Sequence, residues 1–176
     1  MRVIAGELGG RHFDSPHSHR THPMSDRVRG GLFNTLGDIV GLKVLDAFAG
    51  TGALSFEAVS RGAASSLAIE NDRPAQKQIE ANIAVLGVGD RVRLIKSSSN
   101  AWLTTSPNET FDIILCDPPY DDLQLNLLAR LAVRVTQNGL LVLSWPANAE
   151  APSFEGLENV AERNYGDAQL LFYRKD

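Results

Sequence analysis

Hydrophobic positions along the chain follow two different spacings, one typical of helices and the other of strands. After Ser25, four apolar residues recur at helical spacing: Val28, Leu32, Phe33 and Leu36. Ser25 is a favourable N-cap for such a helix, and Asp26 in the first turn suits the positive end of the helix dipole. We therefore expect the first helix to begin just after Ser25 and to end near Gly37.

From residue 43 onward, short apolar runs alternate with amphipathic stretches. The runs predict strands at residues 43–48, 66–70, 91–96, 111–117 and 140–145. The stretches between them predict helices at residues 53–61, 74–86, 100–103 and 123–135. Two more strand candidates, 159–163 and 169–173, predict a closing hairpin. Because strands alternate with helices, the fold class is α/β, with a doubly wound, mostly parallel seven-stranded sheet covered on both faces.

The N-terminal part of the chain lacks this alternation. Residues 2–5 and 11–13 flank a glycine-rich stretch, as the strands of a hairpin would, and residues 14–23 have the composition of an extended loop. We therefore divide the chain into an N-terminal arm at residues 1–24 and one domain at residues 25–176.

Composition sets the broad class of the protein. The chain has 176 residues, 43% of them hydrophobic and 22% charged, as expected for a single globular domain. Its longest apolar runs, such as 113–116 and 140–143, fall far short of the ~18 residues of a membrane span. No apolar export segment follows Met1, and the one cysteine, Cys116, cannot form an internal disulfide. We expect a cytoplasmic protein without a membrane segment, and a monomer because no association stripe is evident.

Charge is distributed unevenly. The net charge is −4, which by itself argues against a nucleic-acid partner. The segment from Met1 to Gly31 nevertheless holds more arginines than acidic residues, namely Arg2, Arg11, Arg20, Arg27 and Arg29. A basic arm on an acidic body suggests a polyanionic partner, although a solvated basic surface would explain it equally well. All four histidines also lie in this arm, at irregular spacing, so we expect no metal site.

The segment Asp46-Ala47-Phe48-Ala49-Gly50-Thr51-Gly52 lies between a predicted strand and a predicted helix. In a doubly wound sheet this is where a nucleotide-like ligand binds, and glycines let the backbone approach it closely. The dinucleotide fingerprint G-x-G-x-x-G has a third glycine where this chain has Ser55. Asp46 suits a cationic amino group better than a pyrophosphate. The loop therefore favours S-adenosylmethionine (SAM) over NAD.

Glu70 supports a nucleoside ligand. It ends the second predicted strand, the next one along the chain after the strand that ends near Asp46. An acidic residue about 20 residues beyond such a loop can accept hydrogen bonds from ribose hydroxyls. Without Glu70, the glycines would be explained as well by a tight turn.

A second motif, Asp117-Pro118-Pro119-Tyr120, follows the fourth predicted strand. The prolines fix φ and have no N–H donor, so the loop is rich in hydrogen-bond acceptors. Acceptors beside an aromatic ring can hold the hydrogens of an exocyclic amine while Tyr120 stacks on the base, a contact worth ~1–3 kcal/mol. The amine could then attack a sulfonium methyl group in line.

Together, these two motifs resemble those of class I SAM-dependent (Rossmann-like) methyltransferases that act on amino groups. Further segments are similar to the RsmD family: Arg2-Val3-Ile4-Ala5-Gly6, Gly9-Gly10-Arg11, Asp26-Arg27-Val28-Arg29, Leu32-Phe33-Asn34, and Ala53-Leu54, Glu57-Ala58 and Ser60-Arg61-Gly62-Ala63 in the first helix after the glycine loop. That family methylates the N2 amine of one guanine in 16S rRNA of the small ribosomal subunit.

The resemblance implies a role for each candidate residue. It implies that SAM is held by Asp46, Phe48, Gly50, Gly52, Glu70, Asn71 and Ser98. It implies that the guanine is engaged by Asp117, Pro118, Pro119 and Tyr120, and that the arm arginines named above contact RNA. Two departures from the family pattern are His22, where the family usually has Arg-Pro-Thr, and the serines 97–99, where it often has an acidic residue.

Three alternatives stay open. The second motif does not distinguish guanine N2 from adenine N6, so a DNA adenine methyltransferase is one of them, although no separate DNA-reading domain is evident. An NAD-dependent enzyme is disfavoured by Ser55. The third alternative is a SAM-binding ribosome assembly factor without activity.

Overall fold

The structure is a computed structural model that describes residues 1–15 and 23–176. Its elements along the chain are α1 (Asp26–Leu36), β1 (Lys43–Asp46), α2 (Ala53–Ser60), β2 (Ser65–Glu70), α3 (Arg73–Leu86), β3 (Val92–Lys96), α4 (Ser99–Thr105), β4 (Phe111–Cys116), α5 (Leu125–Ala132), β5 (Val135–Pro146), β6 (Leu157–Tyr165) and β7 (Ala168–Lys175). In the described part of the chain the strands form one seven-stranded sheet of order β3-β2-β1-β4-β5-β7-β6.

The predicted fold class is confirmed. Strands β1 to β5 pair in parallel, and β7 pairs antiparallel with both β5 and β6. The last two strands therefore form the expected closing hairpin. No helix in the described part of the chain has both the length and the apolar character that crossing a bilayer requires.

Several predicted boundaries differ from the structure, most of all between α5 and β5. The helix expected at 123–135 ends at Ala132, and the following strand begins at Val135 rather than at 140. Val135 pairs with Phe111, and a register shift follows before Leu140 pairs with Ile113. Val135 thus belongs to the strand, although its spacing from the preceding apolar residues is that of a helix.

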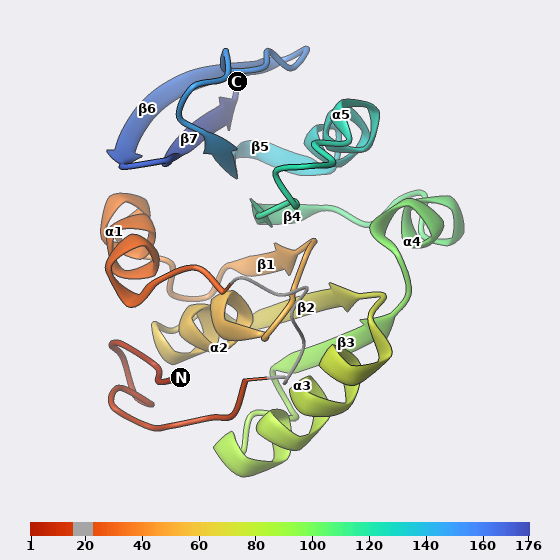
Figure 1. Ribbon diagram of the computed structural model, residues 1–176. Coiled ribbons are helices and arrows are strands. Elements are labelled where there is room, and N and C mark those ends of the chain that lie inside the picture. Colours follow the sequence, from red (N-terminus) through yellow and green to blue (C-terminus); the bar gives the residue numbers. More distant parts are fainter. Residues whose placement is uncertain (16–22) are drawn as a thin grey trace.

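Two helical layers cover the sheet (Figure 1). Helices α4 and α5 pack on one face, where Trp102 and Leu128 join a core that includes Leu45 of β1. Helices α1, α2 and α3 pack on the other face in two adjoining clusters, one of which includes Phe56 of α2.

The segment 1–15 docks on the outer side of α2 and α3. The predicted hairpin is present as a single bridge between Arg2 and His12. The ring of Phe13 meets the ring of Phe56 edge to face, with centroids 5.2 Å apart. Asn82 of α3 exchanges two hydrogen bonds with the backbone of Asp14. These contacts fix the described part of the N-terminal arm against the domain.

Candidate functional site

The two sequence motifs meet at the carboxyl edge of the sheet. β1 lies between β2 and β4, and from there the strand order runs in opposite directions. Asp46, the last residue of β1, pairs with Leu115 of β4, and the Ala47 N–H donates to the Leu115 carbonyl at 3.0 Å. The loops after β1 and β4 therefore emerge side by side at a topological switch point, where ligands bind in open α/β sheets.

The glycines of the first loop are required by its backbone. Gly50 and Gly52 have φ values of 54° and 79°, in the left-handed region that glycine adopts without strain. A Cβ atom on Gly52 would lie 2.8 Å from the Phe56 ring. The loop can therefore turn sharply into α2 only with a glycine at this position.

Glu70 ties this loop to the next one. Its two carboxylate oxygens accept hydrogen bonds from the Gly50 N–H and the Asp72 N–H, each at 2.7 Å. Because a carboxylate oxygen can accept more than one hydrogen bond, Glu70 can still receive a ligand hydroxyl. The sequence suggested only the ligand contact, whereas the side chain also holds the loop.

Asp46 is the most unusual group of the site. Its side chain is 1% exposed, and its Oδ2 accepts hydrogen bonds from the Ser55 N–H at 3.2 Å and the Ser55 hydroxyl at 2.9 Å. Among the described residues, Oδ1 has no hydrogen-bond partner. Burial raises the pKa of Asp46 to about 7, and the nearby carboxylates of Asp117 and Glu70 add to the rise. A cationic group beside Oδ1 would satisfy the orphaned oxygen and stabilise the ionised carboxylate, so the residues present fit an amino-acid ammonium.

The second loop carries a carboxylate and an aromatic ring. Burial raises the pKa of Asp117, and the Ser144 hydroxyl opposes that rise. The Tyr120 phenol lies 2.8 Å from the same Ser144 oxygen, within hydrogen-bond distance. Tyr120 is 40% exposed, so part of its ring is open to a flat partner. The loop thus combines an acceptor with a stacking surface.

The serines after β3 divide two tasks. Ser98 caps α4 by accepting a hydrogen bond from the Ala101 N–H at 3.2 Å. The hydroxyl that reaches the first loop belongs to Ser99, which donates to the Ala47 carbonyl. The cofactor roles suggested for Ser98, for the exposed Asn71 and for the half-buried Phe48 stay predictions.

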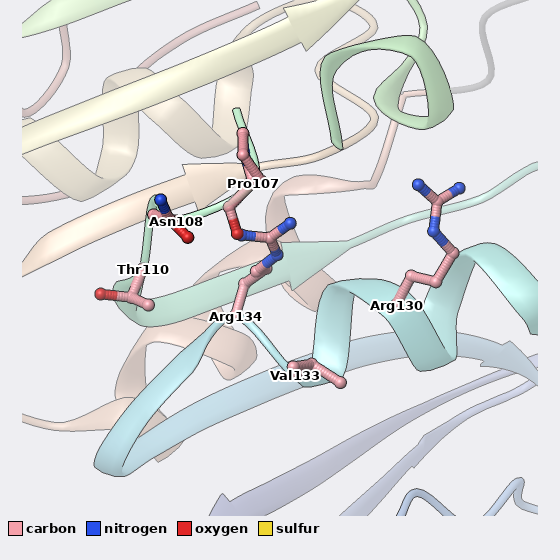
Figure 2. A pocket seen from close by; sticks show the side chains of 6 residues that line it. All are labelled: Pro107, Asn108, Thr110, Arg130, Val133 and Arg134. Carbon is pink, nitrogen blue, oxygen red and sulfur yellow. The ribbon is translucent and has the colours of Figure 1, made fainter. Parts of the chain in front are cut away.

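Two hollows differ in their relation to this site. One, of about 620 Å³, is lined by Asn100 and by residues 123–127, directly beyond the Asp117–Tyr120 loop. The other, of about 450 Å³, lies at the opposite end of β4. Figure 2 shows Arg134 reaching across that second hollow toward Pro107, whose carbonyl accepts its hydrogen bond.

The structure separates the arginines predicted to contact RNA. Arg29 is fully buried and donates to the carbonyls of Met24 and Arg2 and to the Asp26 carboxylate, so the predicted RNA contact of Arg29 is wrong. Arg2 is exposed and paired with Asp26, and Arg27 is exposed.

Of the other two arginines predicted to contact RNA, one lies among the described residues. Arg11 donates to the carbonyls of Val85 and Leu86 at the end of α3. Arg20 lies outside the described residues.

Three serines of the site were missed as functional residues in the sequence analysis. Ser55 counted there only as a departure from the third glycine, although its hydroxyl bonds Asp46. Ser66 bonds Ser55 in turn, at 3.0 Å. Ser144 lies on β5 and carried no local signal, because only the pairing of β4 with β5 brings it beside the second loop.

Comparison with known proteins decides the family. The model of the family described as "Conserved hypothetical protein 95" matches residues 1–174. The chain belongs to this family. The resemblance to the RsmD family is thereby confirmed.

Several relatives have been named. The chain is 40% identical over 121 residues to ribosomal RNA small subunit methyltransferase D of Escherichia coli (strain K12), an alignment covering 68% of this chain and 60% of that protein. The chain thus spans about three fifths of the length of that relative. It is 29% identical over 182 residues to YlbH of Bacillus subtilis (strain 168), with 99% of each chain covered.

The solved structures agree on the fold. The Escherichia coli protein yhhF superposes with a TM-score of 0.89 at 30% identity, covering 100% of this chain and 98% of that one. A Streptococcus mutans structure with 18% identity, a TM-score of 0.70 and 84% of this chain covered (48% of that one) shares the fold alone. The similarity to yhhF therefore covers the full length of this chain.

Proposed function

We propose that the protein transfers a methyl group from SAM to the exocyclic N2 amine of a guanine in 16S rRNA of the small ribosomal subunit. One observation carries the proposal: a buried carboxylate with an unpartnered oxygen lies beside an acceptor-rich loop with an exposed aromatic ring. The named RsmD-family relatives support the substrate class. An rRNA substrate would also place the protein in the cytoplasm.

The loop after β1 would hold the cofactor. Asp46 Oδ1 would accept from the ammonium group, and Glu70 from the ribose hydroxyls, while Gly50 and Gly52 allow close approach of the backbone. When bound, SAM supplies an electrophilic methyl group on a sulfonium. Binding of the ammonium group to Oδ1 would explain why Asp46 is buried although its burial lowers the stability of the free protein.

The loop after β4 would hold the base. The Asp117 carboxylate and the carbonyls of the proline pair can accept the hydrogens of the amine, which turns its lone pair toward the methyl group. Tyr120 can stack on the base, worth ~1–3 kcal/mol. Catalysis then rests on alignment and on fixed acceptors rather than on a covalent intermediate.

Access requires the target guanine to leave its stack. The exposed arginines Arg2 and Arg27, near the start of α1, would contribute phosphate contacts. Such contacts position the RNA and weaken with salt.

The proposal is tested by methyl transfer from radiolabelled SAM to three acceptors: small subunits lacking the modification, naked 16S rRNA, and duplex DNA. We expect label on subunit RNA, recovered after digestion as N2-methylguanosine. Label on DNA as N6-methyladenine would instead assign the protein to the adenine-directed enzymes. SAM binding without transfer to any acceptor would favour the assembly-factor alternative.

A further inference from the structure

A chain of hydroxyl groups leads to Asp46 from the interior of the domain. The Ser66 hydroxyl on β2 donates to the Ser55 oxygen at 3.0 Å, and the Ser55 hydroxyl on α2 donates to Asp46 Oδ2 at 2.9 Å. All three side chains are buried, with exposures of 1%, 0% and 1%. Burying a polar group costs free energy unless the group is hydrogen-bonded. The two hydrogen bonds therefore fix how the three side chains are oriented.

The chain has a direction. A serine hydroxyl has one proton to donate. Because the Ser55 oxygen already accepts from Ser66, its own proton points to Asp46, and the Ser55 N–H donates to the same carboxylate oxygen. Both donors therefore act on Oδ2, which leaves Oδ1 buried and without a hydrogen-bond partner among the described residues.

The charges around Asp46 all oppose its ionisation. Asp117 approaches from the loop after β4 and Glu70 from the end of β2, and both are acidic. Burial also raises the pKa of the nearby Cys116 thiol, so that it stays neutral. Among the described residues no salt bridge includes Asp46. The Ser55 donors are what favour the charged form.

We infer that Ser55 and Ser66 are positioning residues that aim the Asp46 carboxylate at the cofactor and couple capture of the cofactor's amino group to release of a proton. The inference rests on the proposed placement of that amino group at Asp46. In the free protein, part of the population carries a proton on Asp46. When the ammonium binds, this proton leaves for the solvent, and the carboxylate and the ammonium form an ion pair.

Calorimetric binding of S-adenosylhomocysteine, the demethylated product of SAM, tests this without any acceptor. Affinity is measured from pH 5.5 to 8.5, and proton release from the dependence of the heat on buffer ionisation. The matched probe is methylthioadenosine, which has the nucleoside but no amino-acid moiety. The proteins are wild type, Ser55→Ala, Ser66→Ala and Ser55→Thr, which keeps the hydroxyl. Ser60→Ala is the control, because Ser60 is another buried serine of α2 whose hydrogen bonds go to Ala5 and Leu8.

In the wild type we expect affinity for the homocysteine ligand to rise with pH through about 7, with release of about half a proton at pH 7. Ser55→Ala should move the midpoint upward by ~1 pH unit and lower affinity at pH 7 by up to ~10-fold. Ser66→Ala should shift it less in the same direction. Ser55→Thr and Ser60→Ala should keep the wild-type midpoint, and methylthioadenosine should bind every variant without this pH dependence.

Two results overturn the inference. If both serine-to-alanine variants keep the wild-type midpoint and proton release, the hydroxyl chain does not act on Asp46. If methylthioadenosine shows the same pH dependence as the amino-acid ligand, the proton does not report on the amino group. In either case wild-type binding itself leaves the proposed function intact, whereas a wild type that binds neither ligand refutes both. A melting curve for each variant shows whether it is folded. If Ser55→Ala does not fold, the comparison of Ser66→Ala with the wild type tests the inference.

Discussion

At the residue scale, the site contains two buried carboxylates whose ionisation lowers the stability of the folded protein. Asp46 and Asp117 end neighbouring strands or begin the loops beyond them, and burial raises the pKa of both. A protein selected only for stability would replace such groups by neutral ones. The proposed function accounts for their presence at the switch point, because each would accept hydrogen bonds from a ligand.

Asp46→Asn should therefore stabilise the ligand-free protein. A carboxyl whose pKa rises from 3.8 to about 7 on folding contributes stability that is complete below pH ~4 and is lost as the pH rises to 7. At pH 8 we expect the free energy of unfolding of the variant to exceed that of the wild type by ~2–4 kcal/mol. At pH 4 the two free energies of unfolding should be equal. Urea unfolding at both pH values measures this. Equal stability of the two proteins at pH 8 would show that the Asp46 charge does not destabilise the fold. In a separate measurement, S-adenosylhomocysteine should bind the variant poorly at either pH.

Ser144→Ala should impair transfer without affecting cofactor binding. The substitution removes the hydrogen bond between the Ser144 and Tyr120 hydroxyls, and it removes the hydroxyl that favours ionised Asp117. Since one such bond to a charged group is worth ~1.5 kcal/mol, kcat should fall about 10-fold. The KM for SAM should stay within about twofold. The acid limb of the kcat profile should move to higher pH, because Asp117 is the stronger acceptor for the amine hydrogens when it is ionised. A change confined to the KM for SAM would contradict this role.

At the element scale, one buried carboxylate on α2 bonds the N-terminal arm to the helical layer, in addition to the contacts of Phe13 and Asp14. Glu57 is 0% exposed and accepts from the Ile4 N–H at 2.8 Å, the Ala5 N–H at 3.1 Å and the Arg61 guanidinium at 2.7 Å. The buried Arg29 lies 3.8 Å away. This side chain connects α1, α2 and the arm, so the arm is an integral part of the helical layer.

Glu57→Ala should cost ~3–5 kcal/mol of unfolding free energy, because it leaves the Ile4 and Ala5 N–H groups without their acceptor and removes one of the two carboxylates beside the buried Arg29 charge. The matched control is Glu80→Ala, whose exposed pair with Lys96 should be worth at most ~1 kcal/mol. Chemical denaturation of the two variants beside the wild type gives the comparison. Equal losses in the two variants would contradict the proposed role of Glu57.

Sequence patterns determined these elements to different degrees. The parallel order follows from strand–helix alternation, and the glycine loop and the Asp117–Tyr120 motif both carried local signals. Glu57 carried none as an anchor, since its partners in the arm lie far away in the chain. The start of β5 was missed because the pairing of Val135 with Phe111 depends on tertiary contact rather than on periodicity.

At the scale of the whole molecule, the protein is acidic, so the proposed RNA contacts depend on a small set of cations. The net charge is −4, and burial removes Arg29 from the arginines of the basic segment Met1–Gly31 that could contact RNA. Composition could count that arginine but could not show that its donors are spent on Met24, Arg2 and Asp26. The remaining footprint is smaller and should depend strongly on salt.

Arg27→Ala and Arg29→Ala should therefore fail in different ways. Arg27 is exposed, so its loss should weaken rRNA binding several-fold and reduce the slope against log salt by ~0.7–0.9, with little change in stability. Loss of Arg29 should instead cost ~3–5 kcal/mol of unfolding free energy, because it empties a fully buried position and leaves the Met24 and Arg2 carbonyls without their donor. Filter binding over a salt series and urea unfolding separate the two. Equal RNA defects in two equally stable proteins would contradict the assignment.

The most direct test of the proposed function compares wild type with Asp117→Ala in two measurements on the same preparations. One is S-adenosylhomocysteine affinity, and the other is single-turnover methyl transfer to small subunits lacking the modification. We expect affinity within a few-fold of wild type and transfer reduced by at least ~100-fold, because Asp117 holds the acceptor amine and not the cofactor. Full transfer by Asp117→Ala would contradict the proposal that the loop after β4 is the acceptor site.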